Sequence, residues 1–390
     1  MMRALVVGCG LSGAVVARQL AEAGWEVVIY ERRDHIGGNM YDFVDDYGIL
    51  VHKYGPHTFH TKKKELFDYV SKFCEWQEYR LCCGAEIDGI CTPTPFNFQT
   101  IDDFYTQESA KELKNEIRKE FGDRDTATVV EVLNCNNSVV RNYAKFLFEK
   151  DYSLYTAKQW GVSPEEIDPN VLKRVPLRFD YSQGYFDDEY QIMPKISFTN
   201  FFENLLNHPN ITVKLGVDAL DHLEIAPNGR ELLWDGKLLE NPVIYTGAID
   251  ELFDNCEGSL PYRSLRFEWK HEERDSFQDF PVVAYPQANG YTRIVEFKKL
   301  PVQTAQGTTY EIEYPLQYEV GKGLEPYYPL LTKASQERYL LYSDRVSRIK
   351  HLYCCGRLAD FKYYNMDQAL ERALEISRVI LSSWCKNEFN

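Results

Sequence analysis

A glycine-rich turn near the amino terminus constrains the fold of this chain more than any other feature. The apolar run 4–7 leads into Gly8-Cys-Gly10-Leu-Ser-Gly13, and Glu31 ends the next apolar segment. In such a turn the first glycine permits the tight bend, the second lets the backbone approach a pyrophosphate, and the third lets the helix pack against the strand. The pattern predicts strands at 3–8 and 26–31 around a helix at Gly13–Ala23. It also predicts a dinucleotide site in which Glu31 binds ribose hydroxyls.

A second pair of glycines bears on which dinucleotide is bound. Gly37-Gly38 follows Glu31 within six residues. NAD-binding domains have no general need for glycines at this point. FAD-binding domains often do, because the chain passes close to the ribityl and isoalloxazine groups and only glycine allows so close an approach. We therefore expect FAD rather than NAD.

Composition limits the partners of the chain. Its 390 residues carry a net charge of −15 with a pI near 5.1, which argues against nucleic acid and against an anionic membrane surface as partners. No apolar run approaches the roughly twenty residues that cross a bilayer. The ten cysteines show no C-x-x-C or metal-type spacing. We expect a cytoplasmic protein with buried free thiols and no metal site.

Periodicity along the chain predicts a nucleotide-binding fold that is interrupted by other structure. The segment 100–149 reads as helical, with a capping signal at Thr100. Alternation at 262–320 predicts antiparallel strands, and 79–97 reads as a short hairpin. We expect further helices at Lys64–Phe73, Ser109–Phe121, Thr128–Asn134, Ser138–Lys150, Phe198–Leu206 and Asp367–Trp384, and strands at Ile211–Leu215 (buried), Leu232–Trp234, Lys237–Leu239, Val243–Thr246 and Ile349–Cys355.

These elements predict an α/β protein of three parts. The Rossmann-like FAD-binding domain is expected to combine 1–78, 194–250 and 332–390, because both end segments have nucleotide-domain character. A small helical domain is expected at 98–148. An antiparallel β-sheet domain for the substrate is expected to combine 79–97, 149–193 and 251–331.

Several long motifs resemble those of the UDP-galactopyranose mutase family, in family order and nearly from end to end of the chain. They are Gly55-Pro-His-Thr-Phe-His60-Thr, Tyr155-Thr-Ala-Lys-Gln-Trp160-Gly, Leu260-Pro-Tyr-Arg-Ser-Leu-Arg-Phe267, Tyr291-Thr-Arg293-Ile-Val-Glu, Pro326-Tyr-Tyr328-Pro and Gly356-Arg-Leu-Ala-Asp-Phe-Lys-Tyr363. The resemblance implies FAD, a nucleotide-sugar substrate bound in the cleft between the parts, and a homodimer or higher homo-oligomer. It implies that N5 of reduced FAD forms a covalent adduct with the anomeric carbon while UDP leaves. The sugar then recloses as a furanose and UDP returns, without net oxidation.

The resemblance also assigns residues. Arg174 and Arg293 match the two arginines that bind the diphosphate, and a leaving diphosphate needs such cations. His57 and His60 match positions beside the flavin, and no general-base role is assigned to them. The other substrate-binding positions implied are Tyr155, Thr156, Trp160, Tyr185, Tyr328 and Tyr363. The cofactor-binding positions are Gly8, Gly10, Ser12, Gly13, Glu31, Arg32, Gly38, Asn39, His57, Thr58, Val217, Gly247, Arg357, Tyr363, Met366 and Asp367.

Three departures from the family pattern leave the sugar open. Asn365 stands where the family usually has Asp, Ala284 stands where an Asn is common, and Lys298-Lys299 replaces a pair that contains His. The alternatives are the same chemistry on UDP-N-acetylgalactosamine or on a dTDP-deoxysugar, and an FAD-dependent amine or polyene oxidoreductase.

Overall fold

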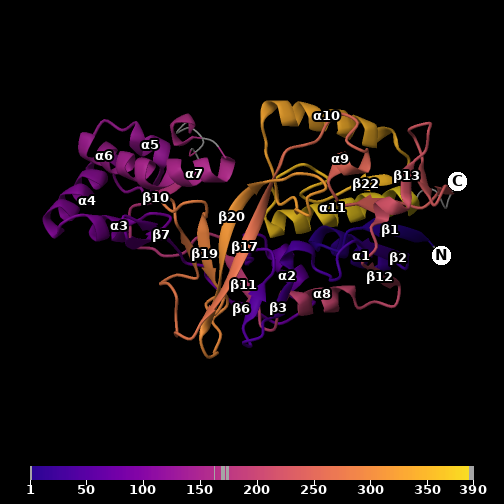
Figure 1. Cartoon of the computed structure of the whole chain (residues 1–390), viewed down its shortest axis with the longest axis horizontal. Helices are drawn as coiled ribbons and strands as arrows, with labels where there is room; N and C mark the ends of the chain where they lie inside the picture. Colours follow the sequence, from indigo (N-terminus) through magenta and orange to yellow (C-terminus); the bar gives the residue numbers. More distant parts are fainter. Residues whose placement is uncertain (1, 162, 168–171, 173–174, 386–390) are drawn as a thin grey trace.

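The structure is a computed structural model that describes residues 2–161, 163–167, 172 and 175–385. The molecule is elongated, and three parts follow one another along its longest axis (Figure 1). A parallel sheet and its helices lie at the end that holds both termini, a cluster of helices lies at the other end, and a long antiparallel sheet lies between them. The predicted fold class, an α/β fold with an inserted helical part and an antiparallel sheet, is confirmed.

The parallel sheet has five strands in the order β12-β2-β1-β16-β22, and every pair in it is parallel. The strands are β1 (Arg3–Val7), β2 (Glu26–Glu31), β12 (Ile211–Leu215), β16 (Val243–Tyr245) and β22 (Leu352–Cys354). All five were predicted. The expectation that β12 is buried is wrong, because β12 is an edge strand and three of its five residues are exposed.

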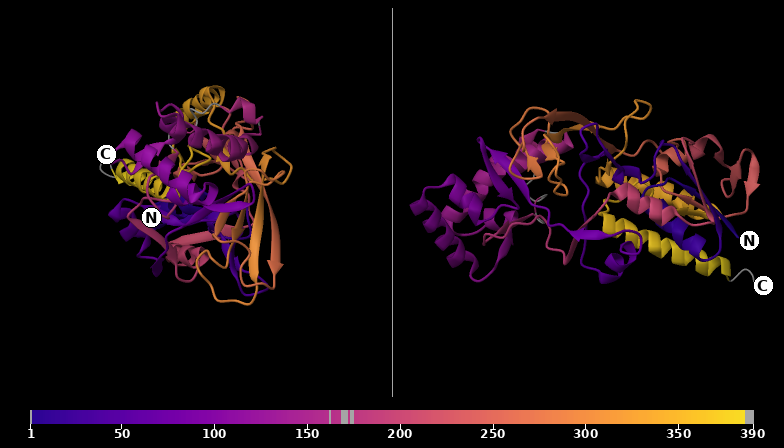
Figure 2. Two further views of the ribbon diagram at one scale, coloured as in Figure 1. Left: turned by 90° about the vertical axis from the view of Figure 1, so that its left-hand side faces the viewer. Right: turned by 90° about the horizontal axis from the view of Figure 1, so that it is seen from below.

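Helices cover both faces of this sheet. Successive residues of β1 point to opposite faces, and over 4–7 both sets are apolar, so each face packs against helices. Val6 packs into a core with helices α1 (Leu11–Glu22), α8 (Phe198–Leu206) and α11 (Met366–Cys385). Val7 packs into a second core with α9 (Ile249–Leu252) and α10 (Lys333–Arg348). Figure 2 shows α11, in yellow, running alongside the amino-terminal helix, which it contacts extensively.

The helical part consists of five helices and a π-helical turn at Phe148–Tyr152. The helices are α3 (Phe98–Phe104), α4 (Gln107–Phe121), α5 (Val129–Leu133), α6 (Ser138–Leu147) and α7 (Ser153–Trp160). The predicted cap at Thr100 is wrong. Asn97 is the N-cap of α3, and Thr100, the third residue of the helix, is its capping-box partner: the Thr100 hydroxyl accepts the Asn97 N–H at 3.3 Å. In a capping box the N-cap residue and the third helical residue each bond to the other's backbone N–H, so the sequence alone does not show which of the two is the N-cap.

The antiparallel sheet has seven strands in the order β21-β17-β20-β19-β18-β7-β8. They are β7 (Cys83–Ile87), β8 (Ile90–Thr94), β17 (Tyr262–Glu272), β18 (Val282–Ala284), β19 (Arg293–Glu296), β20 (Thr308–Gln317) and β21 (Tyr328–Pro329). The hairpin predicted at 79–97 forms β7 and β8, and it joins the sheet through a parallel pairing of β7 with β18. Residue Arg293 of β19 lies directly opposite Glu313 of β20.

Shorter elements connect these parts. They are α2 (Lys64–Val70), the strand pair β3 (Asp42–Val44) and β4 (Leu50–His52), the three-stranded sheet of β5 (Phe59–Thr61), β11 (Tyr190–Pro194) and β6 (Trp76–Glu78), the pair β9 (Thr126–Thr128) and β10 (Pro176–Arg178), and the meander of β13 (Leu223–Ile225), β14 (Leu232–Trp234) and β15 (Lys237–Leu239). Within the described ranges, no helix is both long and apolar enough to cross a membrane.

Candidate functional site

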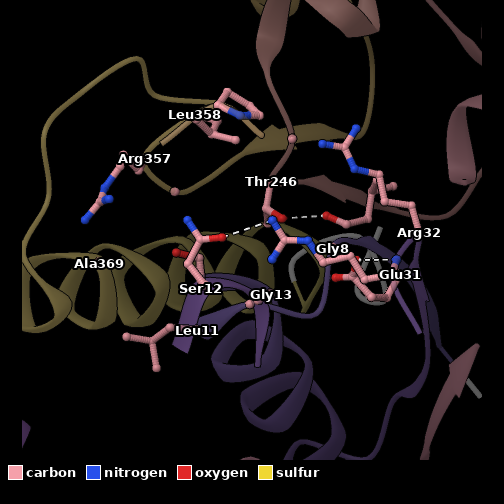
Figure 3. A pocket seen from close by; sticks show the side chains of 18 of the residues that line it. Gly8, Leu11, Ser12, Gly13, Glu31, Arg32, Thr246, Arg357, Leu358 and Ala369 are labelled. Atoms are coloured by element: carbon pink, nitrogen blue, oxygen red, sulfur yellow. Dashed lines mark hydrogen bonds between the residues drawn. The ribbon is translucent and has the colours of Figure 1, made fainter. Parts of the chain in front are cut away.

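A cavity lies at the carboxyl ends of β1, β2 and β16, where ligands bind in open α/β sheets. Figure 3 shows Glu31 and Arg32 towards one end of it and Arg357 towards the other. The predicted cofactor residues that line the cavity are Gly8, Gly10, Ser12, Gly13, Glu31, Arg32, Gly38, Asn39, His57, Gly247, Arg357 and Met366. The structure does not place Thr58, Val217, Tyr363 and Asp367 in its lining.

Close backbone packing explains the glycines of the first turn. Gly8 has a φ of +99°, and a Cβ there would lie 2.1 Å from the hydroxyl of Thr246. A Cβ on Gly13 would lie 2.0 Å from the carbonyl oxygen of Gly8, so α1 could not pack as it does. Gly10 differs, since the nearest atom to its Cβ would be the Gly38 Cα at 3.7 Å. The fold therefore needs Gly8 and Gly13, whereas the protein atoms leave room beside Gly10, which lines the cavity.

If the cavity holds FAD, as the sequence predicts, Gly10→Ala should weaken its binding at least about tenfold, because the added methyl group would enter the space that a pyrophosphate needs. Titrating the apoprotein with FAD and following flavin fluorescence measures this affinity. The melting temperature of the Gly10→Ala apoprotein should stay near that of the unmodified protein, whereas Gly13→Ala should lower it. Equal FAD affinity in Gly10→Ala and the unmodified protein would contradict the role of Gly10.

Backbone donors fix the carboxylate of Glu31 at the end of β2. It accepts the N–H of Cys9 at 2.7 Å and the N–H of Arg33 at 2.9 Å. Arg33 also forms an ion pair with Glu325 at 2.8 Å, and Glu325 lines the cavity from the segment that follows β20. An oriented acid, a glycine turn and a helix N-terminus together fit a dinucleotide.

His57 and His60, which the sequence places together, lie in different surroundings. His57 lines the cavity, and its Nδ1 lies 2.8 Å from the carbonyl oxygen of Gly55. Burial, together with the positive charges of Arg357 and Arg293, lowers the pKa of His57 to about 4. His57 is thus neutral at neutral pH with the proton on Nδ1, so that Nε2 can only accept.

His60 is absent from the lining of the cavity. Its Nδ1 lies 2.5 Å from Asp188, and its ring stacks on Phe186 with centroids 3.6 Å apart. The structure therefore brings His57, but not His60, to the cofactor cavity.

A second group of predicted residues surrounds Arg293. Its Nε and Nη2 both donate to the same carboxylate oxygen of Glu313, at 2.8 and 2.6 Å. Burial raises the pKa of Tyr155, Tyr185 and Tyr328, and in each case the nearby charge of Arg293 opposes the rise. Tyrosines from α7 and β21 and from the segment before β11 are therefore close enough to Arg293 of β19 to be affected by its charge.

Arg357 connects this group to the cavity. It lines the cavity, and its guanidinium lies 5.1 Å from the ring centroid of Tyr328 and 5.4 Å from that of Tyr363. These two tyrosine rings stack at 5.5 Å. Tyr363 therefore lies in the Arg293 group, although it does not line the cavity.

The remaining predicted substrate residues are on or near α7. Thr156 lies in this helix, and Trp160, which ends it, is 46% exposed. Lys158 links α7 to the β18–β19 connection by hydrogen bonds. Its Nζ donates to the carbonyl oxygens of residues 285, 288 and 291. Burial lowers the pKa of Lys158 to about 8. Arg174 lies outside the described residues.

Sequence reasoning missed Arg263 of β17. Its Nη2 donates to the Lys158 carbonyl oxygen at 3.3 Å, and its buried Nε has no hydrogen-bond partner among the described residues. Among the described residues, Arg263 forms no ion pair with an acidic side chain. Burial lowers the pKa of its guanidinium group. A cation so placed suits an anionic ligand. Arg263 stands in the motif at 260–267 that carries the family resemblance, but that motif assigned no role to it.

Comparisons with known proteins agree with this geometry. Residues 150–363 match the UDP-galactopyranose mutase family, and residues 6–73 match a NAD(P)-binding Rossmann-like domain. The chain is 35% identical to the UDP-galactopyranose mutase of Mycoplasma genitalium, over 97% of this chain and 94% of the relative. It is 32% identical to a dTDP-fucopyranose mutase of Escherichia coli, over 98% and 99% of the two chains.

A solved structure of reduced UDP-galactopyranose mutase superposes with a TM-score of 0.70 at 15% identity, and covers 98% of this chain and 94% of that one. This likeness supports the fold alone. The sequence matches go further, since they span nearly the whole chain, and they imply a flavin as the cofactor. This chain belongs to the UDP-galactopyranose mutase family and is an isomerase of the mutase type.

Proposed function

We propose that the protein binds FAD and, with the flavin reduced, interconverts UDP-galactopyranose and UDP-galactofuranose without net redox change. The observation that carries this proposal is the position of Arg357, which lines the cofactor cavity and stacks on Tyr328 and Tyr363 beside Arg293. A flavin ring in the cavity and a diphosphate bound to Arg293 would thus be neighbours, with Arg357 and His57 between them.

Arg293, Glu313 and His57 have separate roles in the proposed reaction. Glu313 holds Arg293 through Nε and Nη2, which leaves Nη1 for a phosphate oxygen. A fixed guanidinium stabilises the charge that develops on departing UDP. Neutral His57 presents Nε2 as an acceptor for a sugar hydroxyl. Reduced FAD, when bound, would supply the N5 nucleophile for the anomeric carbon. Tyr155, Thr156, Trp160, Arg174, Tyr185, Tyr328 and Tyr363 are proposed to bind the nucleotide and phosphates.

The direct test is to incubate the dithionite-reduced protein with UDP-galactopyranose and to separate the products by chromatography. We expect UDP-galactofuranose at an equilibrium fraction, and flavin released by heat should run as FAD. Oxygen or quinone consumption linked to turnover would instead favour an amine or polyene oxidoreductase. Preparations that fold but contain no flavin would refute the cofactor assignment.

A dTDP-deoxysugar is the second candidate substrate, because the dTDP-fucopyranose mutase of Escherichia coli matches almost the whole chain. Of the residues that depart from the family pattern, Ala284 lies directly opposite Arg293 in the β18–β19 register. Asn365 lines the cofactor cavity, and Lys298 pairs with Asp275. Ala284 is therefore the departure best placed to alter the sugar site. Parallel assays with dTDP-fucopyranose and UDP-N-acetylgalactosamine discriminate among these substrates.

Two further properties are proposed from family membership and composition. We expect a homodimer or a higher homo-oligomer, and light scattering of the purified protein tests this expectation. We expect a cytoplasmic location from the acidic composition and the cysteine pattern, which cell fractionation tests.

A further inference from the structure

Glu311 is a fully buried carboxyl group that the proposed mechanism does not use. Its residue is 0% exposed, and neither carboxylate oxygen has a hydrogen-bond partner among the described residues. Buried polar groups are nearly always paired, because an unpaired one loses its hydration without compensation. This group therefore needs an explanation other than packing.

The sheet register places Glu311 next to the Arg293–Glu313 pair. Glu311 and Glu313 are two residues apart on β20, so their side chains leave the same face of the sheet. Glu313 lies opposite Arg293, and Glu311 lies opposite Val295 on β19 and Trp269 on β17. The three ionisable groups thus form one cluster, which we call the Glu311 cluster. Gly55, two residues before His57, lies against the cluster: a Cβ added to Gly55 would be 3.8 Å from a carboxylate oxygen of Glu313.

The neighbouring charges determine whether Glu311 is protonated. Burial, and then the negative charge of Glu313, raise the pKa of Glu311 well above its usual range, while Arg293 opposes them. Arg293 is already bonded through two nitrogens to Glu313 and does not hydrogen-bond to Glu311. The other ionisable groups that face the cluster include His52, His57, Tyr155, Tyr327 and Tyr328, which are uncharged at neutral pH. Arg357 contributes a further positive charge near His57. With Glu311 protonated, the cluster has one positive and one negative charge.

We propose that Glu311 sets the affinity of the site for the diphosphate of a nucleotide sugar, because its proton keeps the Glu311 cluster neutral. Loss of that proton gives the Glu311 cluster, with Arg293 counted in it, a net negative charge. The diphosphate of a nucleotide sugar, itself doubly negative, is then bound less tightly. Binding and protonation are linked, so a diphosphate ligand also favours the protonated form of Glu311. The inference rests on the proposed function, in which Arg293 binds the diphosphate.

The test measures the dissociation constant of UDP by titration calorimetry from about pH 6 to about pH 10. UDP is the leaving group of the proposed reaction, so the measurement needs neither turnover nor reduced flavin. The unmodified holoenzyme should lose affinity at least about tenfold towards the alkaline end. Glu311→Gln should bind UDP as the unmodified protein does at neutral pH and should lack this alkaline loss. In the alkaline range, UDP binding should take up protons in the unmodified protein only.

Controls separate this role from a structural one. Glu268→Gln removes an exposed carboxyl from the opposite face of the same sheet and should keep the alkaline loss. If Glu311→Gln does not fold, Glu311→Met replaces the carboxyl with an apolar side chain of similar length and should give the same flat profile. The same alkaline loss with and without Glu311, or none in the unmodified protein, would overturn the inference while leaving the proposed function intact. No UDP binding at any pH would overturn both.

Discussion

The oxidised protein should show almost no interconversion of UDP-galactopyranose and UDP-galactofuranose, and reduction with dithionite should raise the rate at least about a hundredfold. The reason is electronic, since N5 of a flavin carries a nucleophilic lone pair only in the reduced state. Initial rates in matched oxidised and reduced samples measure the effect.

Two controls make this result specific to the reaction. Total flavin should be equal in both samples, and UDP binding should be measured in each, so that a difference in affinity is not read as a difference in chemistry. Reductant should not be consumed in proportion to product, because the reaction has no net redox change. Equal rates in the two states would rule out a flavin nucleophile and would leave only the fold and family assignments standing.

The sequence predicted structure well where the interactions are local. The glycine turn predicted β1 and β2, because tight turns and close helix packing restrict the residues that fit. The predicted helix Phe198–Leu206 has the predicted bounds. Helix α10 was missed, because only Ser335 and Tyr342 are buried in it and Leu340 and Leu341 face outward, which weakens its amphipathic pattern.

Features of the candidate site that depend on long-range pairing could not be predicted. The family resemblance placed both His57 and His60 beside the flavin, but His60 is paired with Asp188, far along the chain, and does not line the cavity. The partner of Arg293 is Glu313, twenty residues later, and it is fixed by the register of β19 with β20. The burial of Glu311 has the same origin. The proposed roles of the site residues remain predictions.

Arg293→Lys should lower kcat/KM at least about tenfold while the protein folds and keeps its flavin. Lysine preserves a positive charge for Glu313, but it loses the planar fork that bonds Glu313 and that, in the proposed role, also reaches a phosphate oxygen. Charged hydrogen bonds of this kind contribute about 1.5–3 kcal/mol each, and about 1.4 kcal/mol is a factor of ten in rate. Steady-state kinetics under dithionite, with flavin occupancy taken from absorbance, give the measurement.

Arg293→Ala should be a poorer probe than the lysine variant, because it removes a structural partner as well. The Glu313 side chain is 3% exposed, and leaving such a carboxylate unpaired costs about 3–5 kcal/mol of stability. Arg293→Ala should therefore lower the melting temperature together with activity. The double variant Arg293→Met with Glu313→Gln removes both charges and should regain stability but not activity. If Arg293→Lys and the double variant both turned over at the unmodified rate, Arg293 would be a structural ion pair and not a diphosphate ligand.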